Sequence, residues 1–263
     1  MTAIPANIHN IRTSSDIISI LSQFIDKQES DYLRSSATRY LRTLDFFRTY
    51  FPVGHSARIL DFGTGHGLMA ILTKMLFPDL ELTAFDVEVT ERVRRRLTEL
   101  DMKVVDNSIK SQYGKIPFES GTFQVCLFFE VFEHVIEDPR HILRELHRII
   151  ADDGQLFLTT PNLAYVFNRF SLLMGKQPQL FLTGMRNEAE PRGHFREWTL
   201  DELIFLLEDS NFRILKKGYI DAVGTGGLVS ERPLLRMLYY PYKIITKVKP
   251  TMRSQIAIVA KRT

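Results

Sequence analysis

An apolar run that breaks into three alternating glycines constrains this chain more than any other feature of its sequence. Residues 59–67 read Ile-Leu-Asp-Phe-Gly-Thr-Gly-His-Gly. The run predicts a strand followed by a tight turn, in which Gly63, Gly65 and Gly67 let backbone amides approach a ligand where a Cβ would collide. A helix predicted from Leu68 directs its N-terminal amides to the same place. The turn is therefore expected to hold a small polar molecule.

The spacing of these glycines argues against a dinucleotide ligand. The dinucleotide fingerprint Gly-x-Gly-x-x-Gly needs a glycine at position 68, but this chain has Leu68 and its third glycine comes one residue early, at Gly67. The next predicted strand, 80–85, leads into Asp86, about 20 residues after the turn, where a carboxylate can accept both hydroxyls of a ribose. NAD and flavin binding are disfavoured, whereas binding of a ribose is not.

Five later segments follow the turn in the order expected of a known family. They are Val104–Asn107, Ile116–Phe118, Thr122–His134, Gly154–Asn162 and His194–Leu203. With the turn and Asp86, they resemble the class I S-adenosylmethionine-dependent methyltransferases, in particular the subgroup that includes the ubiquinone-biosynthesis O-methyltransferases. The resemblance covers roughly residues 40 to 220.

Strand-like and helix-like runs alternate from residue 58 to residue 160, which predicts a parallel sheet with helices on both faces. The resemblance implies an α/β fold: a Rossmann-like, doubly wound, seven-stranded sheet that is mostly parallel, with an antiparallel last strand over 254–260. We expect a helical N-terminal cap over residues 1–50. The methyltransferase domain is expected over 51–263, with lid insertions near 163–195 and 224–253.

Three segments outside this frame leave alternatives open. Residues 163–185 are apolar and aromatic, and form either a lid over the substrate or part of the core. Residues 233–248 are basic and amphipathic, and either touch a membrane surface peripherally or pack on the domain. Arg92, Arg94, Arg95 and Arg96 are expected to be solvated on the outer face of a helix.

The resemblance implies S-adenosylmethionine as cofactor and assigns a role to each candidate contact. Asp61 orients the turn, the backbone of Gly63 and Gly65 meets the methionine end, Asp86 holds the ribose, Asp106 lies near the adenine amine, and Phe129 lines the methyl-transfer cleft. Phe129 ends the fourth strand, where doubly wound sheets place their ligands.

Two histidines are the candidate catalytic residues. His134 follows the end of the fourth strand by one short turn, and the pKa of an unperturbed imidazole lies near neutrality. Glu133 is placed to orient that ring. His194 lies in a loop before a helix that Thr199 and Glu202 are predicted to cap, and can reach the acceptor across the cleft. The alternatives are a packing role for His134 and a surface loop position for His194.

Composition excludes several kinds of site. The single cysteine, Cys126, lies in an apolar strand, so no internal disulfide and no cysteine cluster for zinc or iron–sulfur can form, and no metal is expected. A net charge of +3 with dispersed lysines and arginines does not indicate a nucleic-acid partner. Residues 1–15 lack an apolar signal core, so we expect a cytoplasmic enzyme.

The leading functional hypothesis is methyl transfer to an oxygen of a small or lipid-linked metabolite. The alternatives are N-methylation of a small molecule, a methyltransferase-like binding protein without turnover, and a nicotinamide oxidoreductase, which the glycine spacing disfavours. Oligomeric state is not indicated by the sequence.

Overall fold

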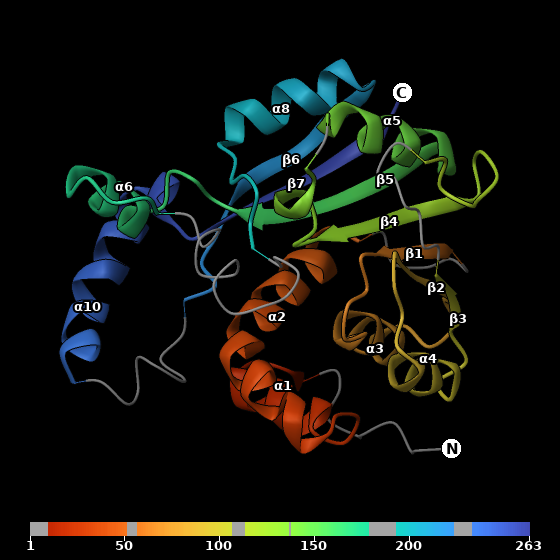
Figure 1. Cartoon of the computed structure of the whole chain (residues 1–263), viewed down its shortest axis with the longest axis horizontal. Coiled ribbons are helices and arrows are strands. Elements are labelled where there is room, and N and C mark those ends of the chain that lie inside the picture. The colour runs from red at the N-terminus through yellow and green to blue at the C-terminus, as the bar shows by residue number, and fades with distance from the viewer. Residues whose placement is uncertain (1–9, 52–56, 107–113, 137, 179–192, 224–232) are drawn as a thin grey trace.

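Seven strands form one mixed sheet in the computed structural model, which describes residues 10–51, 57–106, 114–136, 138–178, 193–223 and 233–263 (Figure 1). The strands are β1 (Arg58–Phe62), β2 (Glu81–Asp86), β3 (Lys103–Asp106), β4 (Phe123–Phe129), β5 (Ile150–Pro161), β6 (Phe212–Ile220) and β7 (Gln255–Arg262). Their order across the sheet is β3-β2-β1-β4-β5-β7-β6. The predicted Rossmann-like fold is confirmed.

The last strand reverses direction, as expected. β7 runs antiparallel to both of its neighbours, with Leu156 opposite Ala260 on β5 and Tyr219 opposite Ile256 on β6. All other pairs are parallel. The strand order changes direction between β1 and β4, and open α/β sheets bind ligands outside the carboxyl ends of the strands at such a point.

Helices cover both faces of the sheet (Figure 1). The helices are α1 (Ser14–Leu21), α2 (Ser30–Tyr50), α3 (Leu68–Leu76), α4 (Glu91–Thr98), α5 (Pro139–Ile149), α6 (Val166–Leu173), α8 (Leu200–Asp209) and α10 (Pro233–Val248), with single 3₁₀ turns η2 (Lys27–Glu29), η3 (Phe132–His134) and η4 (Pro250–Met252). Helices α5 and α8 lie on one face, and α1 to α4 lie on the other. The alternation of side chains along β1 reflects these two layers: Ile59 packs with α2, and Leu60 packs with α5 and α8.

The N-terminal helical segment is divided by a short turn. Thr13 and Asp16 form a capping box at the start of α1, and Asp26 and Glu29 form another at η2, before α2 begins at Ser30. Helix α2 then crosses the sheet and buries Leu44 and other apolar residues. The division into a cap over 1–50 and a domain over 51–263 stays a prediction.

One arginine of α4 is not on the outer face, contrary to expectation. Arg96 is 7% exposed. Its guanidinium donates hydrogen bonds to both carboxylate oxygens of Glu29, at 3.3 and 2.6 Å, and to the backbone carbonyl of His66 at 2.9 Å. Val93 and Leu97 are buried on the same helix, and the partner in the distant turn η2 holds Arg96 on that buried side.

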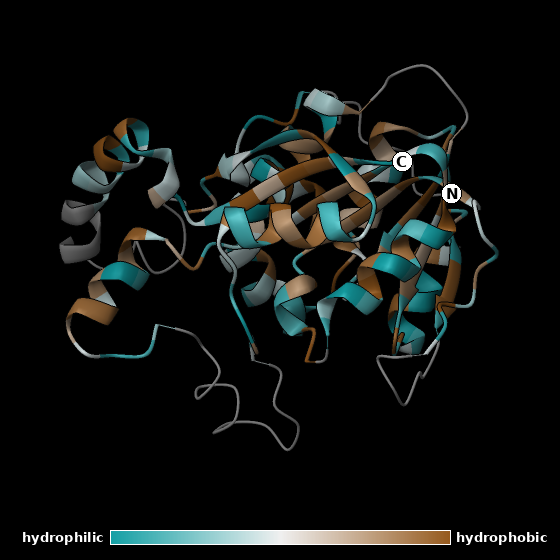
Figure 2. Cartoon of the chain, turned by 90° about the horizontal axis from the view of Figure 1, so that it is seen from above, coloured by the Kyte–Doolittle hydropathy of each residue, from teal (hydrophilic) through white to brown (hydrophobic). Residues whose placement is uncertain are grey.

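Helices α6 and α10 lie beside each other, away from the sheet (Figures 1 and 2). Helix α6 has no buried residue, so the core-packing alternative for this part of residues 163–185 is wrong. The remainder of the two predicted lid segments, 179–192 and 224–232, lies outside the described residues. No helix among the described residues has the length and hydropathy needed to cross a membrane.

Candidate active site

The glycine turn connects β1 to α3 at the carboxyl edge of the sheet. Gly63, Gly65 and Gly67 all have positive φ, at 77°, 52° and 74°. A Cβ on Gly63 would lie 2.3 Å from Cγ2 of Val131, whereas one on Gly65 would meet nothing within 4 Å. Gly63 is therefore required by close packing, while Gly65 presents its backbone to open space in which a ligand can lie.

Asp86 closes the turn from the end of β2. The N–H of Gly65 donates to Oδ2 of Asp86 at 2.8 Å, and the N–H of Val87 donates to Oδ1 at 2.7 Å. Burial raises the pKa of Asp86, and these backbone hydrogen bonds oppose the shift. The carboxylate is thereby held in one orientation beside the turn, with lone pairs left for further donors.

Asp61, near the end of β1, contacts the glycine turn through a side-chain hydrogen bond. Its side chain is 3% exposed, and its Oδ2 accepts a hydrogen bond from the hydroxyl of Thr64 at 2.7 Å. Burial raises the pKa of Asp61 to about 6, against the opposing hydrogen bond from Thr64. Thr64 thus supplies a contact through which Asp61 can orient the turn, and that role stays a prediction.

A cavity of about 150 Å³ lies under the turn and is closed by α2. Its lining includes Asp61, Gly63, Gly65 and Phe129 from the sheet edge. The opposite wall is Tyr32, Arg39, Tyr40 and Thr43 of α2. Four of the six predicted cofactor contacts thus surround one cavity, whereas Asp86 and Asp106 do not line it.

Arg39 brings a positive charge to this cavity, and sequence reasoning missed it. Its guanidinium lies 3.4 Å from Oε2 of Glu130, a residue with positive φ that follows β4. Glu130 is further held by Thr159 at 2.9 Å and by Gln255 at 2.5 Å. The signal available in the sequence was a lone arginine in an amphipathic helix, which gives no hint of the cavity that the helix covers.

Asp106 is placed differently from expectation. It lies opposite Asp86 in the β2–β3 register, at the same sheet edge, but its Oδ2 accepts a 2.6 Å hydrogen bond from Arg94. The side chain is 48% exposed and the residues that follow it, 107–113, lie outside the described residues. A contact with an adenine amine stays a prediction.

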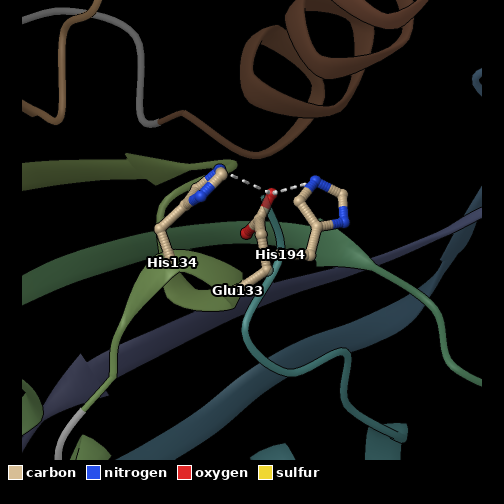
Figure 3. Close-up of side chains that lie close together, drawn as sticks. All are labelled: Glu133, His134 and His194. Carbon is tan, nitrogen blue, oxygen red and sulfur yellow. Dashed lines mark ion pairs between the residues drawn. The ribbon is translucent and has the colours of Figure 1, made fainter. Parts of the chain in front are cut away.

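The two candidate catalytic histidines lie next to each other, with Glu133 between them (Figure 3). Their ring centroids are 5.2 Å apart. The loop that carries His194 is fixed to η3 because the N–H groups of Phe195 and Arg196 both donate to the carbonyl of Glu133, at 2.9 and 3.3 Å. Residues far apart in the sequence are thus joined by backbone hydrogen bonds, which no sequence motif reveals.

The tautomers of both rings follow from their partners. Nδ1 of His134 lies 3.3 Å from the carbonyl of Gly193, and Nδ1 of His194 lies 3.1 Å from Oε1 of Glu197. A carbonyl and a carboxylate accept, so each Nδ1 carries the proton and each Nε2 offers a lone pair. The two Nε2 atoms lie 4.0 and 3.9 Å from Oε1 of Glu133.

Burial sets the protonation of this cluster. Glu133 is 1% exposed, and burial, with the nearby charge of Glu130, raises the pKa of its carboxyl well above the ordinary value. Burial and the neighbouring ring of His194 lower the pKa of His134 from 6.5. His134 is therefore a neutral imidazole at neutral pH, able to accept a proton.

The same three side chains are also a candidate set of metal ligands. One ligand atom each from Glu133, His134 and His194 lies within 4.8 Å of the others. Two imidazoles and a carboxylate suit a divalent transition metal. In each ring Nε2 is the atom left to bind the metal, and the Nδ1–H donates to an oxygen, as in most metal-bound histidines. The sequence-based expectation of no metal rested on the single cysteine, and it did not consider a site built from these two histidines and Glu133.

The chain is similar in sequence to known methyltransferase domains. A family model described as a methyltransferase domain matches residues 32–217. A ubiquinone biosynthesis O-methyltransferase of Xanthomonas oryzae pv. oryzae is 34% identical over 107 residues, which are 40% of this chain and 44% of that relative. The chain thus matches less than half the length of this curated relative.

Solved structures share the fold. A SAM-dependent methyltransferase of Thermotoga maritima, described as a possible histamine N-methyltransferase, superposes with a TM-score of 0.57 at 14% identity, covering 94% of this chain and 100% of that one. A 1,6-didemethyltoxoflavin N1-methyltransferase of Burkholderia thailandensis, with S-adenosylhomocysteine bound, gives 0.54 at 13% identity, covering 95% and 87%. At these identities the likeness shows the fold alone.

Proposed function

The chain belongs to the family of methyltransferase domains that use S-adenosylmethionine, and we propose that it transfers the donor's methyl group to an oxygen of a small or lipid-linked metabolite. The observation that carries the proposal is the position of the glycine turn. The turn faces a cavity that Arg39 and Glu130 also line, and Glu130 precedes by three residues Glu133, which forms a cluster with His134 and His194. The relatives named as O-methyltransferases support oxygen as the acceptor atom.

The donor's parts match the polar groups of the cleft. A cavity of about 150 Å³ is small beside the roughly 300–1,000 Å³ of ordinary ligand sites, so it takes the methionine end alone. Arg39 offers a cation to the methionine carboxylate. The amides of Gly63, Gly65 and Gly67 already donate to acceptors within the protein, so the cation is the main polar contact for this carboxylate. The ribose then lies over Asp86, whose carboxylate accepts from its hydroxyls.

Methyl transfer needs alignment more than it needs a strong base. The methyl carbon moves from the sulfonium to the acceptor oxygen in line, the carbon–sulfur bond pair stays on sulfur as a neutral thioether, and the acceptor hydroxyl loses its proton. Orientation of two reactants can supply about 7–11 kcal/mol, and a general base about 10²- to 10⁴-fold. Nε2 of His134 accepts the proton, while Gly193 fixes its ring.

Glu133 and His194 complete this proton-accepting site. Once His134 is protonated, its positive charge at 4.0 Å favours the ionised form of Glu133, against the burial that raises the pKa of this carboxyl, and the carboxylate then stabilises the imidazolium. Thr160 donates to the other carboxylate oxygen of Glu133 at 3.0 Å and so fixes its orientation. His194 supplies a second lone pair on the same side, which positions the acceptor hydroxyl.

The test is an acceptor screen with product analysis. The chain is incubated with methyl-labelled S-adenosylmethionine and panels of phenols, catechols and amines, and the products are identified by mass spectrometry. O-methylated phenols or catechols, lost in His134→Gln and kept in His147→Gln, are the expected result. Methylation of amines alone would favour the N-methyltransferase alternative. Donor binding without turnover of any acceptor would favour a binding protein.

A further inference from the structure

Helices α6 and α10 form an arm that stands apart from the sheet in both views (Figures 1 and 2). They are joined by aromatic contacts: the rings of Phe167 and Tyr242 stack at 5.8 Å, and Tyr165 meets Tyr242 edge-on at 6.1 Å. The arm begins where β5 ends, at the same sheet edge as Glu133 and its histidines. In the function proposed above, this is the sheet edge at which the acceptor binds.

The α6 part of the arm is apolar and uncovered. No residue of this helix is buried, and Phe170 and Leu173 are 61% and 84% exposed. Further large apolar side chains in or next to the helix are also exposed, namely Phe167, Leu172 and Met174. Clustered exposure of this kind on a folded protein marks an interaction surface.

Helix α10 has two distinct faces. Tyr242 and Thr246 are buried, whereas Tyr240, Ile244 and Val248 are 70%, 66% and 81% exposed. The exposed residues recur every four positions and so form one stripe along the helix. Lys243 and Lys247 flank that stripe, three residues after Tyr240 and Ile244. Lys243 forms an ion pair with Asp221 at 2.6 Å, whereas Lys247 is exposed. An exposed apolar stripe bordered by lysines is the pattern of a helix that lies in a membrane interface.

The charged residues of the arm are all basic in the two stretches 163–178 and 239–254. Residues 163–178 and 239–254 contain no aspartate or glutamate. Their basic residues are Arg169, Lys176, Lys243, Lys247, Lys249 and Arg253. Further basic residues line a hollow of about 580 Å³ between α2, β6 and α10. Arg42, Lys216 and Lys217 lie there together with three basic residues of the arm, namely Lys243, Lys247 and Arg253. Two acidic residues line the same hollow, Asp45 and Asp221.

We propose that the arm of α6 and α10 docks on an anionic lipid bilayer, with its apolar side chains at the acyl boundary and its lysines against the headgroups. Apolar area and positive charge together give such binding its strength. The inference deepens and rests on the proposed function, because a protein that methylates a lipid-linked acceptor must meet it at a bilayer. A partner protein is a poorer match, because both helices combine exposed apolar residues with a single sign of charge.

The experiment is co-sedimentation of the full chain with vesicles, in the absence of any methyl donor. Vesicles of phosphatidylcholine alone are compared with vesicles that contain 30% phosphatidylglycerol, a composition of about one-third anionic lipid chosen to give a negative surface potential. We expect binding to the anionic vesicles, weakened more than 10-fold by the double variants Phe170→Ser/Leu173→Ser and Lys247→Glu/Lys249→Glu. Added salt should weaken the binding of the wild type as well.

Two matched controls lie outside the arm. Phe205→Ser removes an exposed phenyl ring from α8, where the side chain is 66% exposed, and Arg95→Glu reverses an exposed charge on α4. Both should sediment like the wild type. Absence of binding to anionic vesicles would overturn the inference, as would binding that the arm variants leave unchanged. Concentration-dependent self-association that Phe170→Ser/Leu173→Ser abolishes, without vesicle binding, would assign the arm to a second copy instead.

The result is separable from the proposed function. Binding of S-adenosylhomocysteine is measured in parallel for every variant, and we expect the arm variants to bind it as the wild type does. Loss of vesicle binding with donor-site binding intact therefore tests the arm alone. Failure of the acceptor screen with vesicle binding intact would contradict the methylation proposal and leave the arm's role standing.

Discussion

The backbone N–H of Gly65 donates a 2.8 Å hydrogen bond to Oδ2 of Asp86, which joins the glycine turn to the end of the neighbouring strand. A positive φ at Gly65 points the amide toward the carboxylate, and the open space beside Gly65 leaves the backbone accessible. Asp86 thus fixes the turn, so the shape of the turn and the proposed ribose contact depend on the same carboxylate.

Arg39→Gln should weaken binding of S-adenosylhomocysteine by roughly 10-fold or more. A hydrogen bond to a charged group contributes about 1.5–3 kcal/mol, and 1.4 kcal/mol corresponds to about a factor of ten. The measurement is calorimetric titration. Arg42→Gln is the matched control, because Arg42 lies on the same helix with a side chain 45% exposed and outside this cavity. Equal dissociation constants for the two variants would contradict the role given to Arg39.

The pH dependence of methyl transfer should follow His134. Since burial and the neighbouring ring of His194 lower its pKa from 6.5, protonation removes the base only on the acid side of pH 6.5. The rate should rise along a limb centred below pH 6.5 and stay level through neutrality. His134→Gln should lower kcat by about 10²- to 10⁴-fold and remove the limb. If the acid limb persists in this variant, the limb reports the titration of another group and the role given to His134 is wrong.

Chelator-treated protein should bind one divalent cation such as Zn²⁺ or Mn²⁺ at Glu133, His134 and His194, because two imidazole lone pairs face a carboxylate oxygen. The bound ion would occupy Nε2 of His134, so it should compete with the proton that this base accepts and inhibit methyl transfer. The measurement is calorimetric titration of chelator-treated protein. His194→Gln should lower the affinity markedly, whereas His147→Gln, at a surface site on α5, should leave it unchanged. Absence of metal binding, or an affinity that His194→Gln leaves unchanged, would show that these three side chains do not form a metal site.

The buried pair of Glu29 and Arg96 should make stability depend on acid pH. Burial alone would raise the pKa of Glu29, but hydrogen bonds from Arg96 and His66 outweigh it and lower the pKa to about 2. Because the folded pKa lies below the unfolded one, the stabilisation is complete above about pH 4.5 and is lost as pH falls toward 2. Thermal unfolding monitored by circular dichroism across this range should show a decline that Glu29→Gln lacks.

Glu29→Gln itself should destabilise the fold by about 3–5 kcal/mol at neutral pH, since it leaves Arg96 buried without its anionic partner. The double variant Glu29→Gln/Arg96→Met should recover part of that loss. Glu91→Gln is the control, because that side chain is 93% exposed and its ion pair with Arg94 spans 3.7 Å. Its free energy of unfolding should change by less than about 0.5 kcal/mol.

Local patterns were sufficient to predict the sheet and one wall of the site. The glycine spacing and the apolar runs are signals that lie within a few consecutive residues. The positions of β1, its turn and Asp86 could therefore be predicted from the sequence alone. The strand bounds differ by a few residues, as for β5, which begins at Ile150 where Gly154 was expected. Such differences arise because pairing with neighbouring strands extends a strand beyond its apolar centre.

Contacts between distant segments could not be predicted in the same way. Arg39 reaches the cavity because α2 crosses the glycine turn, and Arg96 is buried because η2 brings Glu29 to it. His194 meets His134 because its loop donates backbone hydrogen bonds to Glu133. Each relation depends on how separate elements pack, and a single sequence carries no periodic signal for it.

Calorimetric titration of the chain with S-adenosylmethionine, S-adenosylhomocysteine and NAD, alongside Asp86→Ala and the control Asp79→Ala, tests directly whether the cleft binds the methyl donor. Asp79 is an exposed carboxylate before the same strand. We predict micromolar binding of the first two ligands, lost in Asp86→Ala and kept in Asp79→Ala, and no binding of NAD. Preference for NAD, or binding of the first two that Asp86→Ala leaves intact, would contradict the account of the cleft as a site for the methyl donor.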